Sequence, residues 1–269
     1  MVSYLVVLFT LLKEAFMEFR THPKEKLYFT LMAFISLILY AGSGALFYYN
    51  KLLGGIYLGY ALVILAFSYL ISLVFIGFLK GNTVKVSEQQ FSDLYKIAQN
   101  HAQALDMPKV PDIYIMQSGG VLNAFATRFS GRNFVILYSA TLEAGYQEGM
   151  EAVSFILGHE LGHIKQGHVS FWWTMLIWPA QLIPFLGSAY SRVREYTCDN
   201  IGYNLSPEGA IPGMLILATG AKLYKKVDVA VFTNQMETEW TFAAKFSELL
   251  SSHPALIKRI KVLSKLGLK

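Results

Sequence analysis

The amino-acid sequence predicts an α+β fold that is mainly helical, in which a domain with a small antiparallel sheet follows a hairpin of two transmembrane helices. Residues 27–50 and 52–79 contain no charged side chain, and each run exceeds the ~20 residues that cross a bilayer as a helix. An apolar run of helical character covers 152–163. Three short runs rich in β-branched and aromatic residues, separated by turn-forming residues, lie between residues 112 and 138.

The composition favours a membrane location. Of the 269 residues 54% are hydrophobic, and the mean hydropathy is +0.40, which is too apolar for an ordinary soluble enzyme. The net charge of +5 suits an anionic bilayer surface, and no basic cluster is interleaved with aromatic residues, so we expect no nucleic-acid partner. The single cysteine, Cys198, excludes an internal disulfide framework. The oligomeric state stays open.

We divide the chain into an N-terminal segment (1–26), a transmembrane hairpin (27–79) and a globular domain (80–269). The first segment begins apolar and becomes charged, and no cleavage site follows, so we expect it to stay as an amphipathic helix at the membrane surface. Within the hairpin, Gly55 and Gly59 have the spacing that lets membrane helices approach closely, although glycines that merely face lipid would share it.

Basic residues set the expected orientation. They gather at the open ends of the hairpin: Lys13, Arg20, Lys24 and Lys26 before it, Lys51 alone in its connection, and Lys80 and Lys85 after it. The positive-inside rule places both open ends in the cytoplasm. We therefore expect a multi-pass protein of the cell membrane whose globular domain faces the cytoplasm.

The globular domain begins with a predicted helix and a predicted sheet. The pattern Ser87-Glu88-Gln89-Gln90 is typical of a capping box and predicts a helix that continues to about Leu105. Strands are predicted at 112–116, 121–127 and 134–138. One edge of this antiparallel sheet can hold an extended peptide by strand addition.

The motif His159-Glu160-Leu161-Gly162-His163 ends the apolar helical run. Histidines four apart on a helix lie about 40° apart around its axis, so both imidazoles can reach one ion, and this donor set suits Zn²⁺. Glu160 is placed to take a proton from an attacking water rather than to bind the metal. Two core histidines and a chance glutamate are the alternative, but three polar groups in a buried helix need partners. The motif therefore predicts one zinc ion per chain.

A catalytic zinc site needs a third protein ligand and an open position. Downstream, Glu195 and Asp199 share one helix face at i, i+4 spacing. Glu195 would complete a His₂Glu site, and Asp199 would orient an imidazole through its other nitrogen. A third histidine ligand is not expected, because Val169 stands at the required spacing and His168 falls one residue short. We assign His168 a structural role.

Residues 171–190 form a third uncharged stretch, rich in tryptophan. A single crossing here would separate Glu195 from the histidines across the membrane, and Pro179 and Pro184 disfavour a straight helix. We expect a bent element that dips into the bilayer or covers the site. The rest of the domain is predicted helical at 207–224, 237–250 and 254–266.

Four groups of residues, taken together, resemble the membrane zinc metallopeptidases that include the HtpX proteases and the CAAX prenyl proteases. They are Asn123–Ala126, His159–His168, Ser191-Arg192 leading to Glu195 and Asp199, and His253-Pro254 with Arg259. The resemblance covers about residues 85–265 and implies a zincin-like fold of the gluzincin type.

The resemblance also implies roles for individual residues. The zinc ligands would be His159, His163 and Glu195, with Glu160 as the general base. His253 would stabilise the oxyanion, and Arg259 would form a supporting ion pair, for which Asp199 is the candidate partner. The implied substrate-binding residues, on the edge strand, are Asn123, Ala124 and Phe125. HtpX proteins usually have two crossings between the second histidine and the third ligand, and CAAX prenyl proteases have many more spans, so this chain departs from the family in its membrane part.

The sequence thus predicts a membrane-anchored, zinc-dependent endopeptidase that acts on the cytoplasmic side, and the resemblance implies a role in membrane-protein quality control. Two other functions stay open: a processing protease for prenylated or other membrane-bound peptides, and a non-catalytic membrane adaptor that binds zinc. The small membrane part disfavours the first, and Glu160 with an open coordination position disfavours the second. The expected partners are peptide or membrane-protein substrates and the lipid bilayer.

Overall fold

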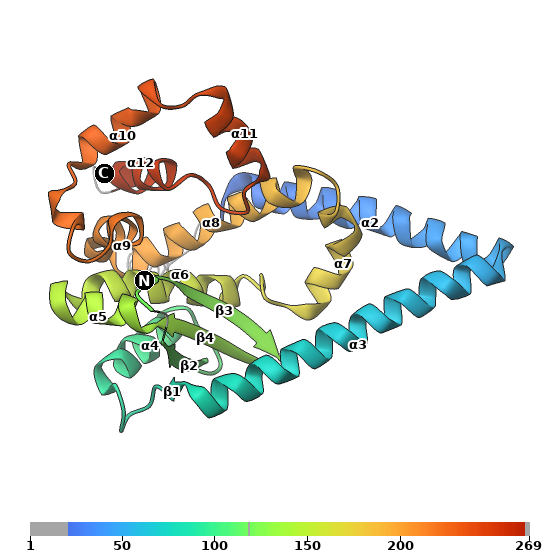
Figure 1. Ribbon diagram of the computed structural model, residues 1–269, viewed down its shortest axis with the longest axis horizontal. Helices are drawn as coiled ribbons and strands as arrows, with labels where there is room; N and C mark the ends of the chain where they lie inside the picture. The colour runs from blue at the N-terminus through green and yellow to red at the C-terminus, as the bar shows by residue number, and fades with distance from the viewer. Residues whose placement is uncertain (1–20, 118, 267–269) are drawn as a thin grey trace, which may run out of the picture.

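The computed structural model describes residues 21–117 and 119–266, so most of the predicted N-terminal amphipathic segment lies outside the described residues. Two long helices, α2 (Pro23–Tyr49) and α3 (Lys51–Asn82), form a hairpin that projects from the rest of the molecule (Figure 1). The elements that follow are β1 (Val84–Lys85), α4 (Ser92–Ala104), β2 (Asp112–Met116), β3 (Ala124–Phe129), β4 (Arg132–Tyr138), α5 (Ser139–Glu148), α6 (Met150–Lys165), α7 (Phe171–Gln181), α8 (Leu186–Leu205), α9 (Pro207–Thr219), η1 (Tyr224–Lys226), α10 (Val229–Thr238), α11 (Phe242–Leu250) and α12 (Leu256–Leu266). The fold is mainly helical, as predicted.

Both hairpin helices are long and apolar enough to cross a membrane, as judged by length and composition. Their large apolar side chains are mostly exposed along the whole length, as expected of surfaces that lipid covers. The connection is a single residue. The backbone N–H of Asn50 donates to the Leu46 carbonyl at 2.8 Å and closes α2, while its side-chain oxygen accepts from the backbone N–H of Leu53 at 3.0 Å and caps α3. The tight hairpin is confirmed.

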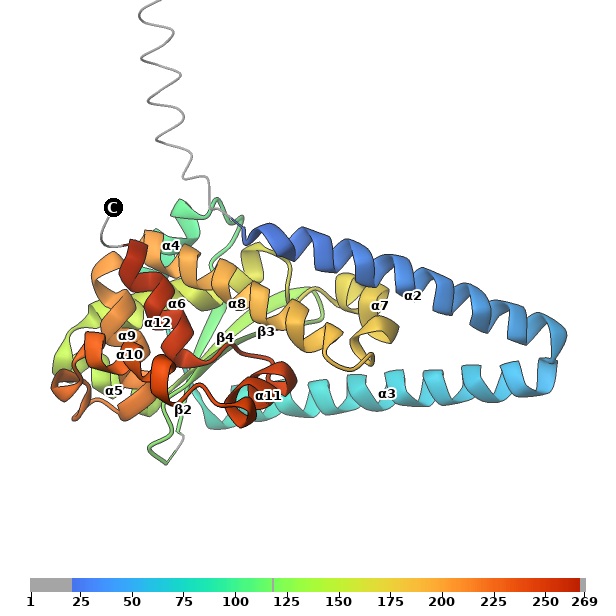
Figure 2. The ribbon, with the colours of Figure 1, turned by 90° about the horizontal axis from the view of Figure 1, so that it is seen from above.

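The predicted close approach at Gly55 and Gly59 is wrong. The two helices touch near the connection, where a Cβ on Gly54 would clash with the Cα of Phe47. A Cβ on Gly55 or Gly59 would meet no described atom within 4 Å. Beyond the connection the helices diverge, and α7 lies between their wide ends (Figures 1 and 2). The other reading of the two glycines, that they face outward, is the one observed.

The sheet is mixed, not antiparallel as predicted. Its order is β1-β2-β4-β3; β1 and β2 pair antiparallel, β2 and β4 parallel, and β4 and β3 antiparallel. After β2 the chain passes to the outer position as β3 and returns through a tight turn at Ser130-Gly131, both with positive φ, so that β4 runs beside β2 in the same direction. Strand β3 therefore lies at one edge of the sheet. It contains Ala124 and Phe125, which are expected on the peptide-binding edge strand.

The helix predicted from the capping box begins five residues later, at Ser92. Ser87 and Gln90 instead pair with each other through backbone hydrogen bonds of 2.9 and 3.2 Å, and Phe91 adopts a left-handed conformation (φ 60°) before α4 starts. A side-chain hydrogen bond from Gln90 to the Lys85 carbonyl at 2.8 Å stabilises this turn. Gln90, which fits the capping-box pattern, therefore stabilises a turn before the helix instead of capping it.

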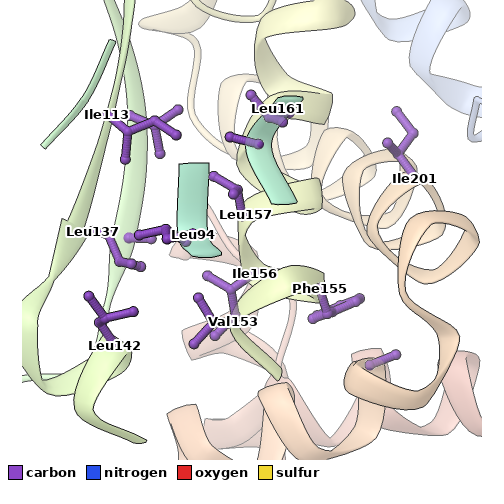
Figure 3. Close-up of a cluster of buried hydrophobic side chains, with 14 of the residues drawn as sticks. Leu94, Ile113, Leu137, Leu142, Val153, Phe155, Ile156, Leu157, Leu161 and Ile201 are labelled. Atoms are coloured by element: carbon purple, nitrogen blue, oxygen red, sulfur yellow. The ribbon is translucent and has the colours of Figure 1, made fainter. Parts of the chain in front are cut away.

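Helix α6 lies at the centre of the core, between the sheet and α8. Its apolar side chains face Leu94, Ile113 and Leu137 on one side and Ile201 on the other (Figure 3). The residues of α6 in this cluster are almost fully buried: Val153, Phe155, Ile156, Leu157 and Leu161. Burial of this kind contributes about 1.5–3 kcal/mol per large apolar side chain, which fixes the helix that carries both histidines.

Glycines bring α6 and α8 into close contact. A Cβ on Gly202 would lie 2.9 Å from the backbone oxygen of Phe155, and a Cβ on Gly158 would lie 3.3 Å from the Cα of Gly202. One turn further along, a Cβ on Gly162 would lie 3.4 Å from the Cα of Cys198. The lack of side chains at these positions allows α8 to bring its carboxylates to the histidines of α6.

The stretch 171–190 is bent, as predicted. Helix α7 has 11 residues, so at 1.5 Å per residue it extends about 16 Å, roughly half of the ~30 Å hydrocarbon thickness. The chain then turns at Leu182–Phe185, where Phe185 has a positive φ of 65°, and returns as α8. Helix α7 packs along α2, with a hydrogen bond of 3.2 Å from the backbone N–H of Ala180 to Ser36 Oγ.

The C-terminal region contains more breaks than predicted. The helix expected at 207–224 ends at Thr219, because Gly220 has a positive φ of 85°, and a short 3₁₀ turn follows. Helices α5 and α10 were not predicted. Thr241 caps the next helix through its side chain, so α11 begins at Phe242 rather than 237. Helix α12 agrees with the prediction to within two residues.

Candidate metal centre

Helices α6 and α8 bring His159, His163 and Glu195 together. One candidate ligand atom from each lies within 4.8 Å of the other two. The Nε2 atoms of the two histidines are 3.2 Å apart, and the carboxylate oxygens of Glu195 lie 3.4 Å from Nε2 of His159 and 3.3 Å from Nε2 of His163. His159 and Glu195 are buried, and His163 is largely so. Both rings thus present the same nitrogen to one carboxylate.

The donor set fits a zinc ion. Two imidazole nitrogens and one carboxylate are typical of catalytic zinc sites, which keep a position free of protein ligands. Glu160, the neighbour of His159 on α6, is also buried, at 8% exposure. The alternative reading of the motif, two unrelated core histidines, does not describe this arrangement, because the rings converge on a charged group from another helix.

Asp199 and Arg259 support His159 from behind. Nδ1 of His159 lies 2.9 Å from Oδ1 of Asp199, and Arg259 on α12 donates hydrogen bonds of 2.7 and 2.5 Å to the two oxygens of that carboxylate. The predicted pairing of Arg259 with Asp199 is therefore present. Arg259 also lies 3.4 Å from Glu195.

Burial and charge act in opposite directions on these groups. Burial raises the pKa of Glu195, but the neighbouring His159, His163 and Arg259 outweigh it and hold that pKa well below its usual value. Burial lowers the pKa of His159, but the carboxylates of Asp199 and Glu195 outweigh it and raise the pKa to about 10. Metal binding at this ring is therefore expected to displace a proton.

His253 reaches the same centre from the segment between α11 and α12. Its Nε2 lies 3.6 Å from Oε2 of Glu195, and the side chain is 63% exposed. Arg192 on α8 holds the end of α11 and the start of this segment by donating to three backbone carbonyls, those of Glu248 (2.7 Å), Leu249 (3.0 Å) and Ser251 (2.8 Å). The structure thus places an exposed imidazole beside the buried donor cluster.

The residues expected to bind substrate lie at the start of the edge strand. Asn123 immediately precedes β3 and is fixed by Thr141, whose Oγ1 accepts from its N–H at 2.9 Å and donates to its carbonyl at 3.0 Å. Ala124 and Phe125 are the first two residues of β3. Strand β3 lies beside α6, so the edge runs along the helix that carries both histidines (Figure 1).

Glu25, on the first turn of α2, contacts His168, and no sequence-based prediction includes it. Its Oε1 lies 2.8 Å from Nε2 of His168, and Thr197 on α8 donates to its other oxygen. Burial lowers the pKa of His168 to about 4, despite the carboxylate of Glu25. A lone carboxylate between Lys24 and Lys26 at the start of a candidate membrane helix is the signal that the sequence offers for it.

The fold and the site define a class: a zincin-type metallopeptidase domain joined to two candidate membrane helices. The chain belongs to peptidase family M48, which matches residues 88–177 and 171–267 and is a family of zinc metalloproteases. The resemblance to the HtpX and CAAX prenyl protease type is confirmed.

Two known proteins are similar to this chain. A protease HtpX homolog from Streptococcus gordonii is 28% identical over 178 residues, which are 64% of this chain and 57% of that protein. The crystal structure of S. mikatae Ste24p matches with a TM-score of 0.50 and 17% identity over 89% of this chain and 65% of that one. This second likeness shows the fold alone. The chain spans less than two thirds of the length of either protein.

Proposed function

We propose that this protein is a zinc-dependent endopeptidase that hydrolyses peptide bonds beside a membrane. The observation that carries the proposal is the convergence of His159, His163 and Glu195 in a member of family M48, next to the buried Glu160. His159, His163 and Glu195 would hold the zinc ion. When bound, zinc would polarise the scissile carbonyl and make water acidic enough to attack near neutral pH.

The side chains then have distinct tasks. The carboxylate of Glu160 accepts the proton of the attacking water and passes it to the leaving amine. The imidazole of His253, beside Glu195 and open to solvent, donates a hydrogen bond to the oxygen on which negative charge develops. Asp199, charge-compensated by Arg259, keeps the ring of His159 in its orientation.

The free edge of β3 is the proposed substrate-binding surface. An extended peptide can pair with the backbone of residues 124–129 and so present its carbonyl beside α6. The far end of this strand, at Arg128 and Phe129, lines a largely apolar cavity of about 730 Å³ between α2, α3 and α7. A cavity of this kind suits the membrane-proximal part of a substrate, which favours membrane proteins and, by the resemblance to HtpX, a role in membrane-protein quality control.

We further propose that the globular domain faces the cytoplasm, on the basis of the basic residues at the open ends of the hairpin. In a Cys198→Ser background, single cysteines at positions 51, 85 and 265 should react differently with a membrane-impermeant thiol reagent. Position 51 should react in intact cells, and positions 85 and 265 only after lysis. Reaction of position 265 in intact cells would mean that the globular domain lies outside the cytoplasm.

The decisive test is Glu160→Gln, because it keeps the shape of the side chain and removes the base. Cleavage of casein, and any self-cleavage in detergent, should fall about 10²-fold or more, with zinc content unchanged. Glu148→Gln, which alters a carboxylate at the end of α5, is the control. Equal activity at equal zinc content would exclude this mechanism, and a protein that binds zinc without cleaving anything would be an adaptor.

A further inference from the structure

A line of three side chains connects the candidate metal centre to the membrane hairpin. His163 directs Nε2 toward Glu195, and its Nδ1 lies 3.0 Å from Nδ1 of His168. His168, on the turn after α6, places its Nε2 2.8 Å from Oε1 of Glu25. Glu25 belongs to the first turn of α2, which lies against α8 (Figure 2). Both ring nitrogens of His168 thus have a partner.

The line is buried and held in place from α8. The side chain of His168 is 2% exposed and that of Glu25 is 10% exposed, and a buried carboxylate needs hydrogen-bond donors. Thr197 supplies a second donor to Glu25, and its own Oγ1 accepts from the backbone N–H of His22 at 2.9 Å. Arg194 donates to the carbonyl of His168 at 3.1 Å. The helix that carries Glu195 therefore also fixes Glu25 and His168.

The hydrogen bonds determine where the protons lie. A metal-facing Nε2 on His163 must be free of hydrogen, so its proton is on Nδ1 and is donated to Nδ1 of His168. His168 then carries its proton on Nε2 and donates it to Glu25. Each contact has one donor and one acceptor. The reverse assignment would put a proton on the nitrogen that faces the metal, so the carboxylate at the end of the line selects the ligating tautomer.

We propose that His168 and Glu25 are positioning residues for His163, so that the first turn of the membrane hairpin orients a ligand of the metal centre. This inference rests on the proposed function. Partners of this kind typically change metal affinity or activity about 10–100-fold when they are removed. Neither residue contacts substrate, so the effect passes through the orientation and basicity of the His163 ring.

A second metal ion is the competing explanation of this cluster, because His163, His168 and Cys198 also lie close enough to share one. The geometry of His163 disfavours it. Its Nε2 faces Glu195, and its Nδ1 faces His168. A second ion bound at Nδ1 would therefore require this ring to bind an ion through both nitrogens and to lose its only proton.

The test uses the full chain in detergent, in a Glu160→Gln background that prevents self-cleavage. The variants are Glu25→Gln, His168→Gln and the pair, with Lys24→Gln, an exposed neighbour on the same turn, as the control. Zinc affinity is measured by competition with a chelator, and the visible spectrum of the Co²⁺-loaded protein reports the ligand field. We expect a 10–100-fold loss of zinc affinity and an altered spectrum in each single variant, and no further loss in the pair, because both residues act through one ring.

Other outcomes overturn the inference. Additive losses in the pair, or a lower melting temperature with wild-type affinity and spectrum, would mean that the residues only stabilise packing. Two metal ions per chain, reduced to one by Cys198→Ser, would mean that the cluster is itself a metal site. A protein that binds no zinc before any of these changes would contradict the proposed function as well, so the two failures are distinguishable.

Discussion

The two histidines of the candidate metal centre have their neighbouring polar groups in opposite regions of the molecule. The support of His159 is charged and lies within the globular domain: Asp199 on α8 and Arg259 on α12. The support of His163 is His168, an imidazole that leads to a carboxylate on the membrane hairpin. The globular domain and the hairpin therefore contact the candidate centre by different physical means. An ion pair on one side depends on matched charges, and a chain of hydrogen bonds on the other depends on tautomer and alignment.

Glu195→Ala should have the largest effect, because Glu195 contacts both histidines. Two imidazoles alone do not retain zinc well, so we expect both zinc binding and cleavage to be lost. Zinc is counted per chain after dialysis, and Glu208→Ala, an exposed carboxylate on α9, serves as the control. If the variant binds one zinc ion per chain as tightly as the wild type, the third ligand lies elsewhere. Glu195 would then not be the residue at which the surroundings of His159 and His163 meet.

Arg259→Met should disrupt the ion pair behind His159, which lies within the globular domain. It leaves the buried carboxylate of Asp199 without its cation, a change that typically costs about 3–5 kcal/mol. We expect a lower melting temperature at saturating zinc, together with weaker zinc binding. Lys261→Met on the same helix should stay within about 0.5 kcal/mol of the wild type. If the Arg259→Met protein has the melting temperature of the wild type, the ion pair near His159 does not stabilise the fold. The contrast with the hydrogen-bonded contacts of His163 would then be lost.

Gly202→Ala tests the close contact between α6 and α8, the helices that carry His159, His163 and Glu195. The added methyl group would lie 2.9 Å from the Phe155 carbonyl, so α8 must move away from α6. Overpacking of this kind typically costs about 1–3 kcal/mol, and the displaced Glu195 should bind zinc less tightly. Gly59→Ala on α3, where the added Cβ would meet no described atom within 4 Å, is the matched change outside the contact. Unchanged stability and affinity would show that the helices have room to separate.

The smallest effect is expected from Trp172 and Trp173, which lie on α7 beside the hairpin and are 76% and 53% exposed. Tryptophan favours the headgroup level, so serine at both positions should weaken the seating of α7 at the bilayer. We expect cleavage of a membrane-embedded substrate to fall several-fold more than cleavage of a short soluble peptide. Equal losses for the two substrates would assign α7 to the fold alone.

The ligand helix could be predicted because its chemistry is local. The spacing from His159 to His163 and from Glu195 to Asp199 is set by one turn of helix, and no long-range information is needed to place each pair on one face. The resemblance supplied Arg259, which sequence spacing alone could not have connected to Asp199. The roles of these residues in catalysis stay predictions.

Long-range pairing was harder to predict. Strand β1 has two residues and no periodicity, and the parallel pairing of β2 with β4 depends on where β3 sits, which no local pattern encodes. Glu25 and His168 are 143 positions apart in the sequence. Spacing along the sequence excludes His168 as a ligand, but it does not reveal that His168 contacts Nδ1 of His163, on the far side of that ring from Glu195.

The candidate centre combines a residue from α2, Glu25, with a residue from α12, Arg259, and these helices are synthesised at different times. The ribosome produces Glu25 among the first residues and Arg259 among the last of those described, at about 5–20 residues per second. The interval between them is therefore on the order of tens of seconds. During that time Asp199 has no guanidinium partner, and the nascent chain carries an incomplete centre while its hairpin enters the bilayer. Under the proposed function, the complete centre would therefore form only after α12 has docked.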